Sequence, residues 1–278
     1  MGMNATRTEL LAAVERSPQA AGSHDRDGWV GLFTSGGCIE DPVGSRPHRG
    51  RAQIERFYDT FIGPRDITFH RHADVVSDST VIRDVTLEVQ MGSSVTMLIP
   101  TFLRYDLDAE LRIERLQAFW ELPAMVWQFA RSGVGAVPAG VQLSRALLRN
   151  QGPSGTAGFL TGFSGVGARA KRHLAALLDD ACAGDEVAVK RRLADAAQIT
   201  RGDADRIGTS ELVALLHGAR WDGMIRAGHS VVARLERAGH RFVLLGEIET
   251  RPTSGGRSSV GHQNRIHAVR VFAEDRRT

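Results

Sequence analysis

Four long runs of alternating apolar and polar residues constrain the fold of this chain more than any other feature. They lie at 67–76, 80–91, 95–105 and 111–122, and short turns rich in Gly, Ser and Asp separate them. Alternation with a period of two is typical of half-buried β-strands, and short polar turns join such strands into antiparallel hairpins. The pattern therefore predicts an antiparallel meander of four strands.

Helical segments come before these strands. Residues 7–14 and 25–33 have helical apolar spacing, and breaks between them are expected at Pro18 and Gly22. A third helix is predicted from residue 51 to about residue 62. Helices followed by a meander of long strands are typical of an α+β domain in which a curved sheet wraps around its helices.

The second half of the chain repeats this order of elements. Its predicted helices and strands lie at 170–183, 185–194, 196–200, 209–217, 224–237, 241–251 and 258–273. A repeated order of elements indicates an internal duplication. Only three long strands follow the last helix, so we expect the second copy to lack the fourth strand of the first.

The connecting segment has an unusual composition. No Asp or Glu occurs from residue 122 to residue 178, whereas Arg, Gly and large apolar residues are frequent. We interpret 123–160 as two short amphipathic helices whose apolar side chains, Trp127 included, are buried within the protein near the first domain. A basic amphipathic surface for an acidic membrane or partner is the alternative. The predicted domains are then 1–122 and 161–278.

Composition limits the class of protein. With 278 residues and 42% hydrophobic content, the chain can form two domains. Lys171 and Lys190 are the only lysines among 35 basic residues, the arginines are scattered, and the net charge is +3, so we expect no nucleic-acid partner. Cys38 and Cys182 form no CxxC or zinc spacing, which favours a reducing cytoplasm. No apolar run of signal-peptide or membrane-spanning length occurs, so we expect a soluble protein.

Two histidines suggest a metal site only weakly. His70 and His72 share a strand face, but a third ligand is not visible. We therefore expect neither a metal nor a cofactor.

The most chemically informative residue is Asp41, in the stretch Cys38-Ile39-Glu40-Asp41-Pro42. In a short strand ended by the proline, Ile39 and Asp41 point to one face while Cys38 and Glu40 point to the other. A carboxylate among apolar walls has a raised pKa and can exchange protons near neutral pH. The alternative is that Asp41 is an Asx-type turn residue before Pro42.

The third strand carries a further candidate. Met97, Ile99 and Thr101 share a face, and Thr101 is the one small polar group in an apolar row. It could bond a neighbouring carbonyl in the core or contact a ligand. Trp120 on the fourth strand is expected in the core.

Residues 8–122 resemble the ketosteroid isomerase branch of the NTF2-like (SnoaL-like) superfamily. The resemblance rests on Asp27-Gly28-Trp29-Val30-Gly31-Leu32-Phe33, on Ile39-Glu40-Asp41-Pro42-Val43-Gly44 followed by Gly50-Arg51-Ala52-Gln53-Ile54-Glu55-Arg56-Phe57-Tyr58, and on Arg112-Ile113 with Gln117-Ala118-Phe119-Trp120. Residues 161–278 are similar to it only in their order of elements and in Leu193-Ala194-Asp195-Ala196-Ala197. The resemblance implies tandem cone-shaped α+β domains, each with helices packed on a curved antiparallel sheet.

The resemblance also implies roles for individual residues. It matches Asp41 to the family's general base and Tyr58 to a supporting tyrosine. The family's oxyanion Tyr and protonated Asp fall at Ser17 and Thr101, so the usual donors are replaced by short hydroxyls. A deep apolar pocket is implied, and we expect its lining to include Phe33, Met97, Ile99 and Trp120.

The leading hypothesis is an isomerase-like enzyme in which Asp41 moves a proton within a bulky hydrophobic substrate of steroid or polyketide type. A non-catalytic binding or scaffold protein is one alternative. An epoxide-opening hydrolase or cyclase of the same fold is another, with Asp84 or Glu88, on a face that looks solvated, as the second acid. In the second copy Arg201 matches Asp41, so we expect 161–278 to be catalytically silent and to serve packing or dimerisation. A homodimer is a possible assembly of the chain.

Overall fold

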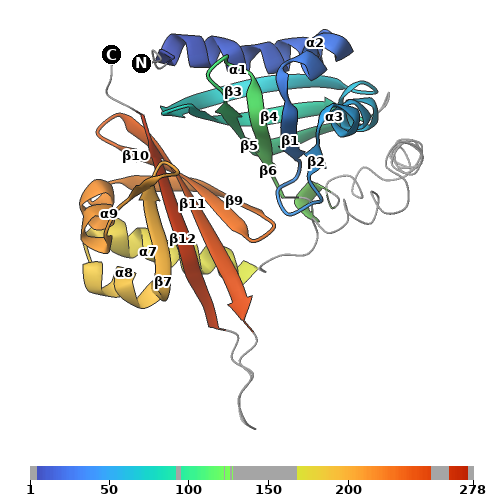
Figure 1. The fold of residues 1–278 in the computed structure, drawn as a ribbon. Helices are drawn as coiled ribbons and strands as arrows, with labels where there is room; N and C mark the ends of the chain where they lie inside the picture. The colour runs from blue at the N-terminus through green and yellow to red at the C-terminus, as the bar shows by residue number, and fades with distance from the viewer. Residues whose placement is uncertain are drawn as a thin grey trace. The chain divides into compact units, whose positions relative to one another are not determined.

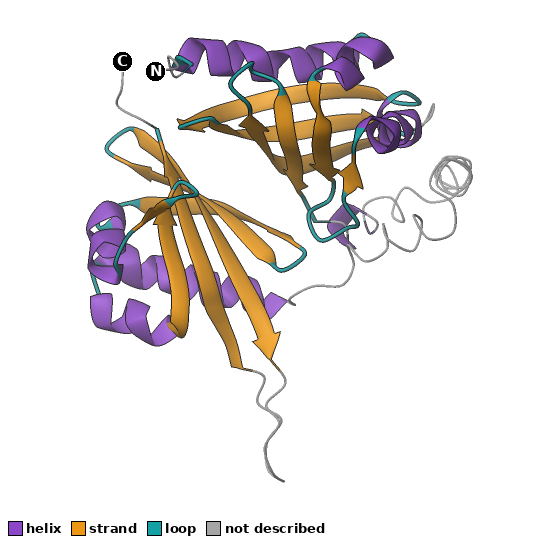
Figure 2. Cartoon of the chain, in the orientation of Figure 1, coloured by secondary structure: helices purple, strands orange, loops and turns teal. Residues whose placement is uncertain are grey.

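A computed structural model of the chain describes residues 5–91, 95–121, 123–125, 127, 168–251 and 263–274. These residues belong to two compact units, which we call the first unit (5–127) and the second unit (168–274). Each unit combines helices with one six-stranded sheet, as Figures 1 and 2 show. The predicted α+β class with tandem domains is confirmed.

Four helical elements precede or interrupt the first sheet. They are α1 (Arg7–Gly22), α2 (Arg26–Gly31), α3 (Arg51–Phe57) and the π-helix η1 (Tyr58–Ile62), which continues α3. Figure 1 shows α1 and α2 along one face of that sheet. The predicted helix from residue 51 to about residue 62 is confirmed.

Helix α1 does not break at Pro18, which corrects one prediction. The helix continues to Gly22, and its buried positions recur at helical spacing on both sides of the proline: Leu10, Ala13, Val14, Ser17, Pro18 and Ala21. A proline inside a helix loses one backbone hydrogen bond and strains the preceding turn. Burial of this continuous stripe against the sheet offsets that loss.

The first sheet is the predicted meander with a short hairpin at one edge. Its strands are β1 (Phe33–Glu40), β2 (His48–Arg49), β3 (Asp66–Ser77), β4 (Thr80–Gln90), β5 (Thr96–Leu107) and β6 (Ile113–Phe119). The spatial order is β2-β1-β6-β5-β4-β3, and only the β1–β6 pair is parallel among these strands. This order brings the end of β1, where Asp41 follows, beside the end of β6.

One face of this sheet packs against the helices, and we call it the inner face. Strand β5 contributes Leu103 and Tyr105 to the hydrophobic core on that face. In the antiparallel register Thr101 lies opposite Val85, and Ile99 lies opposite Leu87. Directly opposed residues point to the same side of a sheet, so the predicted row of β5 lies on the inner face.

The second unit has the same architecture. Its elements are α7 (Ala168–Ala183), α8 (Glu186–Arg192), β7 (Leu193–Arg201), β8 (Asp205–Arg206), α9 (Thr209–Leu216), β9 (Arg220–Ala227), β10 (Ser230–Arg237), β11 (His240–Arg251) and β12 (Gln263–Ala273). The strand order β8-β7-β12-β11-β10-β9 repeats that of the first sheet. The internal duplication is therefore confirmed at the level of topology.

The second copy is complete, contrary to the prediction. The run predicted at 224–237 contains parts of two strands, β9 and β10, joined by a turn at Gly228 and His229. Gly228 has a φ of 55°, a conformation that glycine adopts without strain. The turn takes up only two residues, so the alternating residues on either side of it were predicted as one strand.

Most of the predicted linker 123–160 lies outside the described residues. Met125 packs on the core of the first unit, as predicted for this helix. Trp127 is 67% exposed, so its predicted burial is wrong. Two residues correspond to about 200° around a helix, which directs Trp127 away from the surface that Met125 contacts. In the part of the chain that the structure describes, no helix is long and apolar enough to cross a membrane.

Candidate active site

Asp41 lies where β1 ends, beside the end of β6. Ile39 is fully buried in the core and pairs with Leu116 in the parallel register, so Asp41, two residues on, falls beside Ala118 on the inner face. The Val43 amide donates a 2.8 Å hydrogen bond to the Ala118 carbonyl, which fixes this crossing. The predicted alternation of Ile39 and Asp41 is realised.

The Asp41 carboxylate accepts a hydrogen bond from the indole of Trp120. The distance from Trp120 Nε1 to Asp41 Oδ1 is 2.6 Å. Burial raises the pKa of Asp41 to about 6, and the Trp120 hydrogen bond lowers it in part. A carboxyl group with such a pKa is ionised at neutral pH and accepts a proton more readily than an exposed aspartate.

The turn after β1 is held by Glu40 and not by Asp41. Glu40 Oε1 accepts a 2.9 Å hydrogen bond from the Gly44 amide, and Oε2 accepts one of 2.9 Å from Gln117 Nε2. An Asx turn at Asp41 would use the Val43 amide, which donates to the Ala118 carbonyl instead. The Asp41 carboxylate is directed to Trp120 instead.

Thr101 neighbours this pair on the inner face. Phe102 pairs with Phe119, which places Thr101 on β5 beside Trp120, the residue that directly follows β6. Thr101 is fully buried, and its hydroxyl donates a 3.0 Å hydrogen bond to the Ile99 carbonyl. A hydroxyl has one proton to donate, so Thr101 retains only its acceptor lone pairs.

Ser17 is likewise engaged within the protein. It is buried on α1, and its side chain is hydrogen-bonded to the hydroxyl of Tyr105. Burial raises the pKa of Tyr105, and the Ser17 bond opposes this rise. Ser17 and Tyr105 thus form a core contact between α1 and β5.

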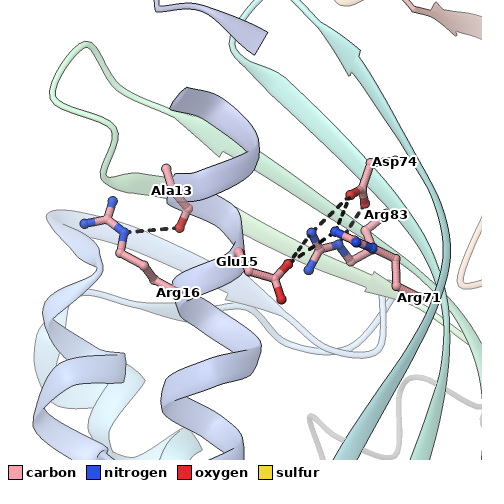
Figure 3. A network of polar contacts seen from close by, with 6 residues as sticks. All are labelled: Ala13, Glu15, Arg16, Arg71, Asp74 and Arg83. Carbon is pink, nitrogen blue, oxygen red and sulfur yellow. Dashed lines mark hydrogen bonds and ion pairs between the residues drawn. The ribbon is translucent and has the colours of Figure 1, made fainter. Parts of the chain in front are cut away.

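A polar network joins α1 to the first sheet on the same face (Figure 3). Arg83 donates from Nε and Nη2 to Asp74, at 2.8 and 3.1 Å, and its Nη2 lies 2.8 Å from Glu15 on α1. Arg71 adds a contact of 3.4 Å to Asp74. Arg83 lies opposite Leu103 in the register, so the network occupies the inner face under α1. These charged groups are paired with one another.

Tyr58 differs from the other candidate donors. Its ring is 3% exposed and packs on Trp29, with ring centroids 5.5 Å apart. The hydroxyl is buried and has no hydrogen-bond partner among the described residues. Burial raises the pKa of Tyr58, so the phenol stays protonated at neutral pH. An unpaired buried hydroxyl is costly, and a ligand oxygen is a suitable partner for it.

The predicted lining residues separate into two groups. Phe33 and Trp120 are buried in the main core of the first unit. Met97 is buried in a smaller apolar cluster, and half-buried Ile99 packs against both clusters. Ile99 therefore lies where the inner face passes from packed core to partly open apolar surface.

The two acids proposed for epoxide opening lie on the opposite face from Val85. Asp84 is buried, contrary to the prediction of a solvated face, because residues 80–85 of β4 are buried on both faces of the sheet. In the register Asp84 lies opposite Phe102. Glu88 is half-buried and contacts His70 Nε2 at 2.7 Å. Since the inner face carries Val85, neither acid shares a sheet face with Asp41.

His70 and His72 each contact a polar side chain of β4. His70 contacts Glu88, and His72 Nε2 lies 2.9 Å from Thr86 Oγ1. Within the described ranges, no three His, Cys, Asp or Glu side chains come together as a metal site requires.

The second unit carries no counterpart of Asp41. Arg201 pairs with Val271 in β12, and Ile199, two residues earlier, pairs with Val269. In the first unit Ile39 pairs with Leu116, and Asp41 follows Ile39 by two residues. Arg201 therefore occupies the register position of Asp41. Arg201 is exposed. The helices and sheet of this unit enclose a core of apolar side chains, many of them fully buried.

Residues 9–127 match the family model of the Nuclear transport factor 2 (NTF2) domain. Solved structures that are similar to part of the chain include the following three. Delta 5-3-ketosteroid isomerase from Mycobacterium sp. is 27% identical, with 42% of this chain and 96% of that chain covered and a TM-score of 0.40. A Mycobacterium tuberculosis protein in complex with estradiol-17beta-hemisuccinate is 22% identical, with coverages of 41% and 95% and a TM-score of 0.39. An M. tuberculosis LEH-like epoxide hydrolase is 19% identical, with coverages of 47% and 96% and a TM-score of 0.41.

The hydrogen bond from Trp120 to Asp41 is the feature of this site that sequence reasoning missed. The pattern assigned Trp120 to the core and the pocket lining, and nothing in its spacing indicated a bond to an acid 79 positions away. A tryptophan two residues beyond the strand neighbour of Asp41 becomes informative only once the β1–β6 register is known.

Proposed function

Since residues 9–127 belong to the NTF2 domain family, we propose that the first unit binds a bulky apolar small molecule and that Asp41 transfers a proton within it. The observation that carries this proposal is the Asp41 carboxylate on the inner face, with Trp120 as its hydrogen-bond donor and a pKa of about 6. Steroid and polyketide ketones are the substrate class that fits an apolar site with one base.

The chemistry follows from the state of the base. Ionised Asp41 removes a proton from a carbon next to the substrate carbonyl, and the electron pair of that C–H bond moves to the carbonyl oxygen to give an enolate. Protonated Asp41 then returns the proton at another carbon of the conjugated system, which completes an isomerisation. The base is regenerated and no other reactant is consumed.

The enolate oxygen needs a hydrogen-bond donor, and Tyr58 is the best candidate. Ser17 is bonded to Tyr105 and Thr101 donates to Ile99, whereas the Tyr58 hydroxyl is unpaired among the described residues. Donors placed where negative charge develops contribute strongly to such reactions, and loss of one typically costs about 100- to 1000-fold in rate. The Tyr58 phenol thus serves as the hydrogen-bond donor to the enolate oxygen in place of the Ser17 and Thr101 hydroxyls.

A binding protein without catalysis is the second candidate. It is favoured by the engagement of Ser17 and Thr101 in bonds within the protein. An epoxide-opening enzyme is the weaker alternative, because Asp84 and Glu88 lie on the opposite face from Val85.

One experiment separates these functions. The protein is incubated with a panel of apolar ketones and epoxides, retained ligand is detected by native mass spectrometry, and chemical change by chromatography. Isomerised ketone supports the proposal, retained but unchanged ligand supports the binding protein, and diol supports epoxide opening. If no member of the panel is retained, the proposal is wrong.

The second unit is proposed to be catalytically silent, because Arg201 occupies the register position of Asp41. Asp203, in the loop after β7, is its nearest acid in sequence. Asp203→Asn should leave turnover within about twofold of wild type. Lost turnover with unchanged thermal stability would assign the second unit a catalytic part.

A further inference from the structure

Arg65 is a buried arginine in the turn between η1 and β3. It is 9% exposed. Its Nη1 donates to the carbonyls of Thr60 and Phe61, at 2.6 and 2.9 Å, and its Nε lies 3.3 Å from the sulfur of Met91. All three partners are neutral, and these contacts use Nη1 and Nε of the guanidinium.

The charge of Arg65 is also uncompensated. Within the described residues no carboxylate lies within ion-pair distance of its guanidinium, and every Asp and Glu of residues 1–167 belongs to that described part. Burial alone acts on this group and lowers the pKa of Arg65, with no acid to oppose it. Arg83, the other buried arginine of the inner face, has Asp74 and Glu15 as partners. A buried cation without a counter-charge is costly in free energy.

The surroundings of Arg65 continue the inner face beyond the Asp41 row. Met91 follows the alternating inner-face positions of β4, and it belongs to the small apolar cluster with Val89, Val95 and Met97. Half-buried apolar side chains pack around this cluster: Ile67, Leu87, Ile99 and Met125. The guanidinium thus borders apolar surface that the protein leaves partly open.

We propose that Arg65 is an anion-binding subsite that receives a carboxylate, sulfonate or phosphate group at one end of an elongated apolar ligand. The inference rests on the proposed apolar ligand site and does not require Asp41 to be catalytic. Nη2, which the contacts to Thr60, Phe61 and Met91 do not use, supplies N–H donors, and the guanidinium supplies the counter-charge that a charge-assisted hydrogen bond needs.

The spacing along β5 fits such a ligand. Thr101 lies beside Trp120, and Met97 belongs to the cluster that Arg65 contacts, four residues earlier on the same strand. At a rise of about 3.3 Å per residue, these positions are about 13 Å apart. A molecule with three or four fused rings and one acidic end spans this length, with its ketone near Asp41 and its anion near Arg65.

A purely structural role for Arg65 makes a different prediction. A basic side chain at a helix C-terminus stabilises the last carbonyls, and Arg65 does so at Thr60 and Phe61. That role accounts for Nη1 and requires no ligand. It predicts that the protein binds charged and uncharged apolar molecules equally well.

The test uses two fluorescent probes that differ only in an anionic group, 1-anilinonaphthalene-8-sulfonate and N-phenyl-1-naphthylamine. Wild-type protein should bind the sulfonate at least about 10-fold more tightly than the neutral probe, as expected for a charge-assisted hydrogen bond to a buried guanidinium. Equal affinities for the two probes would overturn the inference. Failure to bind either probe would count against the proposed apolar site itself.

Variants then assign the preference to Arg65. Arg65→Met should abolish the preference and leave the affinity for the neutral probe within about twofold, whereas Arg49→Met, at an exposed position of β2, should preserve both affinities. If Arg65→Met does not fold by circular dichroism, Arg65→Gln serves, because its neutral amide can still donate to the helix carbonyls and supplies no charge for the sulfonate. An undiminished preference in the folded Met or Gln variant would contradict the assignment. The same preference in Asp41→Asn would show that the subsite is independent of proton transfer.

Discussion

Trp120 Nε1 donates a 2.6 Å hydrogen bond to Asp41 Oδ1. Trp120 directly follows β6, and Asp41 directly follows β1, the parallel neighbour of β6. This bond favours the ionised carboxylate, and the surrounding burial disfavours it. Burial is the larger influence, so the pKa settles at about 6, above the ordinary value of 3.8. Asp41 is thereby kept both ionised and basic at neutral pH.

The Trp120 bond can be tested through the pH dependence of turnover. Because it lowers the pKa of Asp41, Trp120→Phe should move the midpoint of the rise in kcat/KM with pH from about 6 to a higher value. The measurement is a pH–rate profile of both proteins with the substrate identified in the panel. An unchanged midpoint would mean that the indole does not act on the carboxylate in solution.

The same pKa predicts how stability depends on pH. The unfolded chain loses the Asp41 proton near pH 3.8 and the folded protein near pH 6, so this group's contribution to the free energy of unfolding is present below pH 3.8 and is lost as pH rises to 6. The whole change is at most about 3 kcal/mol. Wild type should therefore lose stability relative to Asp41→Asn between pH 4 and pH 7 in urea unfolding. A constant difference between the two proteins would contradict the raised pKa.

Tyr58 and Thr101 should respond in opposite ways to loss of their hydroxyls. Tyr58→Phe removes a group with no partner among the described residues, so thermal stability should be retained or slightly raised while kcat falls by about 100-fold. Thr101→Val removes the bond to Ile99 and should cost about 1 kcal/mol of stability with little change in kcat. Thermal unfolding and initial rates on both variants decide the matter, and a large loss of kcat in the Thr101 variant alone would reverse the two roles.

The Arg83 network should matter for stability and not for chemistry. Arg83→Met leaves Asp74 without its two short hydrogen bonds in a buried site, which should cost about 3 kcal/mol. Arg51→Met removes an exposed pair with Glu55 and serves as the control, with a much smaller effect expected. Equal midpoints of urea unfolding for the two variants would show that the network does not anchor α1.

Period-two alternation was enough to predict the inner face. It placed Asp41 with Ile39 and Thr101 with Ile99 because the face of a strand residue follows from its position alone. Contacts between distant segments do not follow in this way. The Trp120 bond depends on the β1–β6 register, and the lack of a counter-charge at Arg65 depends on which acids lie elsewhere.

Two fold predictions were wrong for different reasons. Gly228 and His229 form a two-residue turn that ends β9, and the run 224–237 was predicted as one strand across it. At Pro18 the local rule predicts a break, but burial of the apolar stripe of α1 continues the helix through the proline. Local rules describe costs, and the packing that offsets them is visible only in the fold.

Asp41 is proposed to transfer a proton to and from a bound apolar ketone, and deuterium exchange measures this transfer directly. Wild type, Asp41→Asn and the control Asp27→Asn, at an exposed position of α2, are incubated with ligand in heavy water. The mass of the recovered ligand is then followed over time. Wild type and the control should introduce deuterium next to the carbonyl, and Asp41→Asn should do so at least about 100-fold more slowly while binding ligand equally well. Exchange at the wild-type rate in Asp41→Asn would contradict the account.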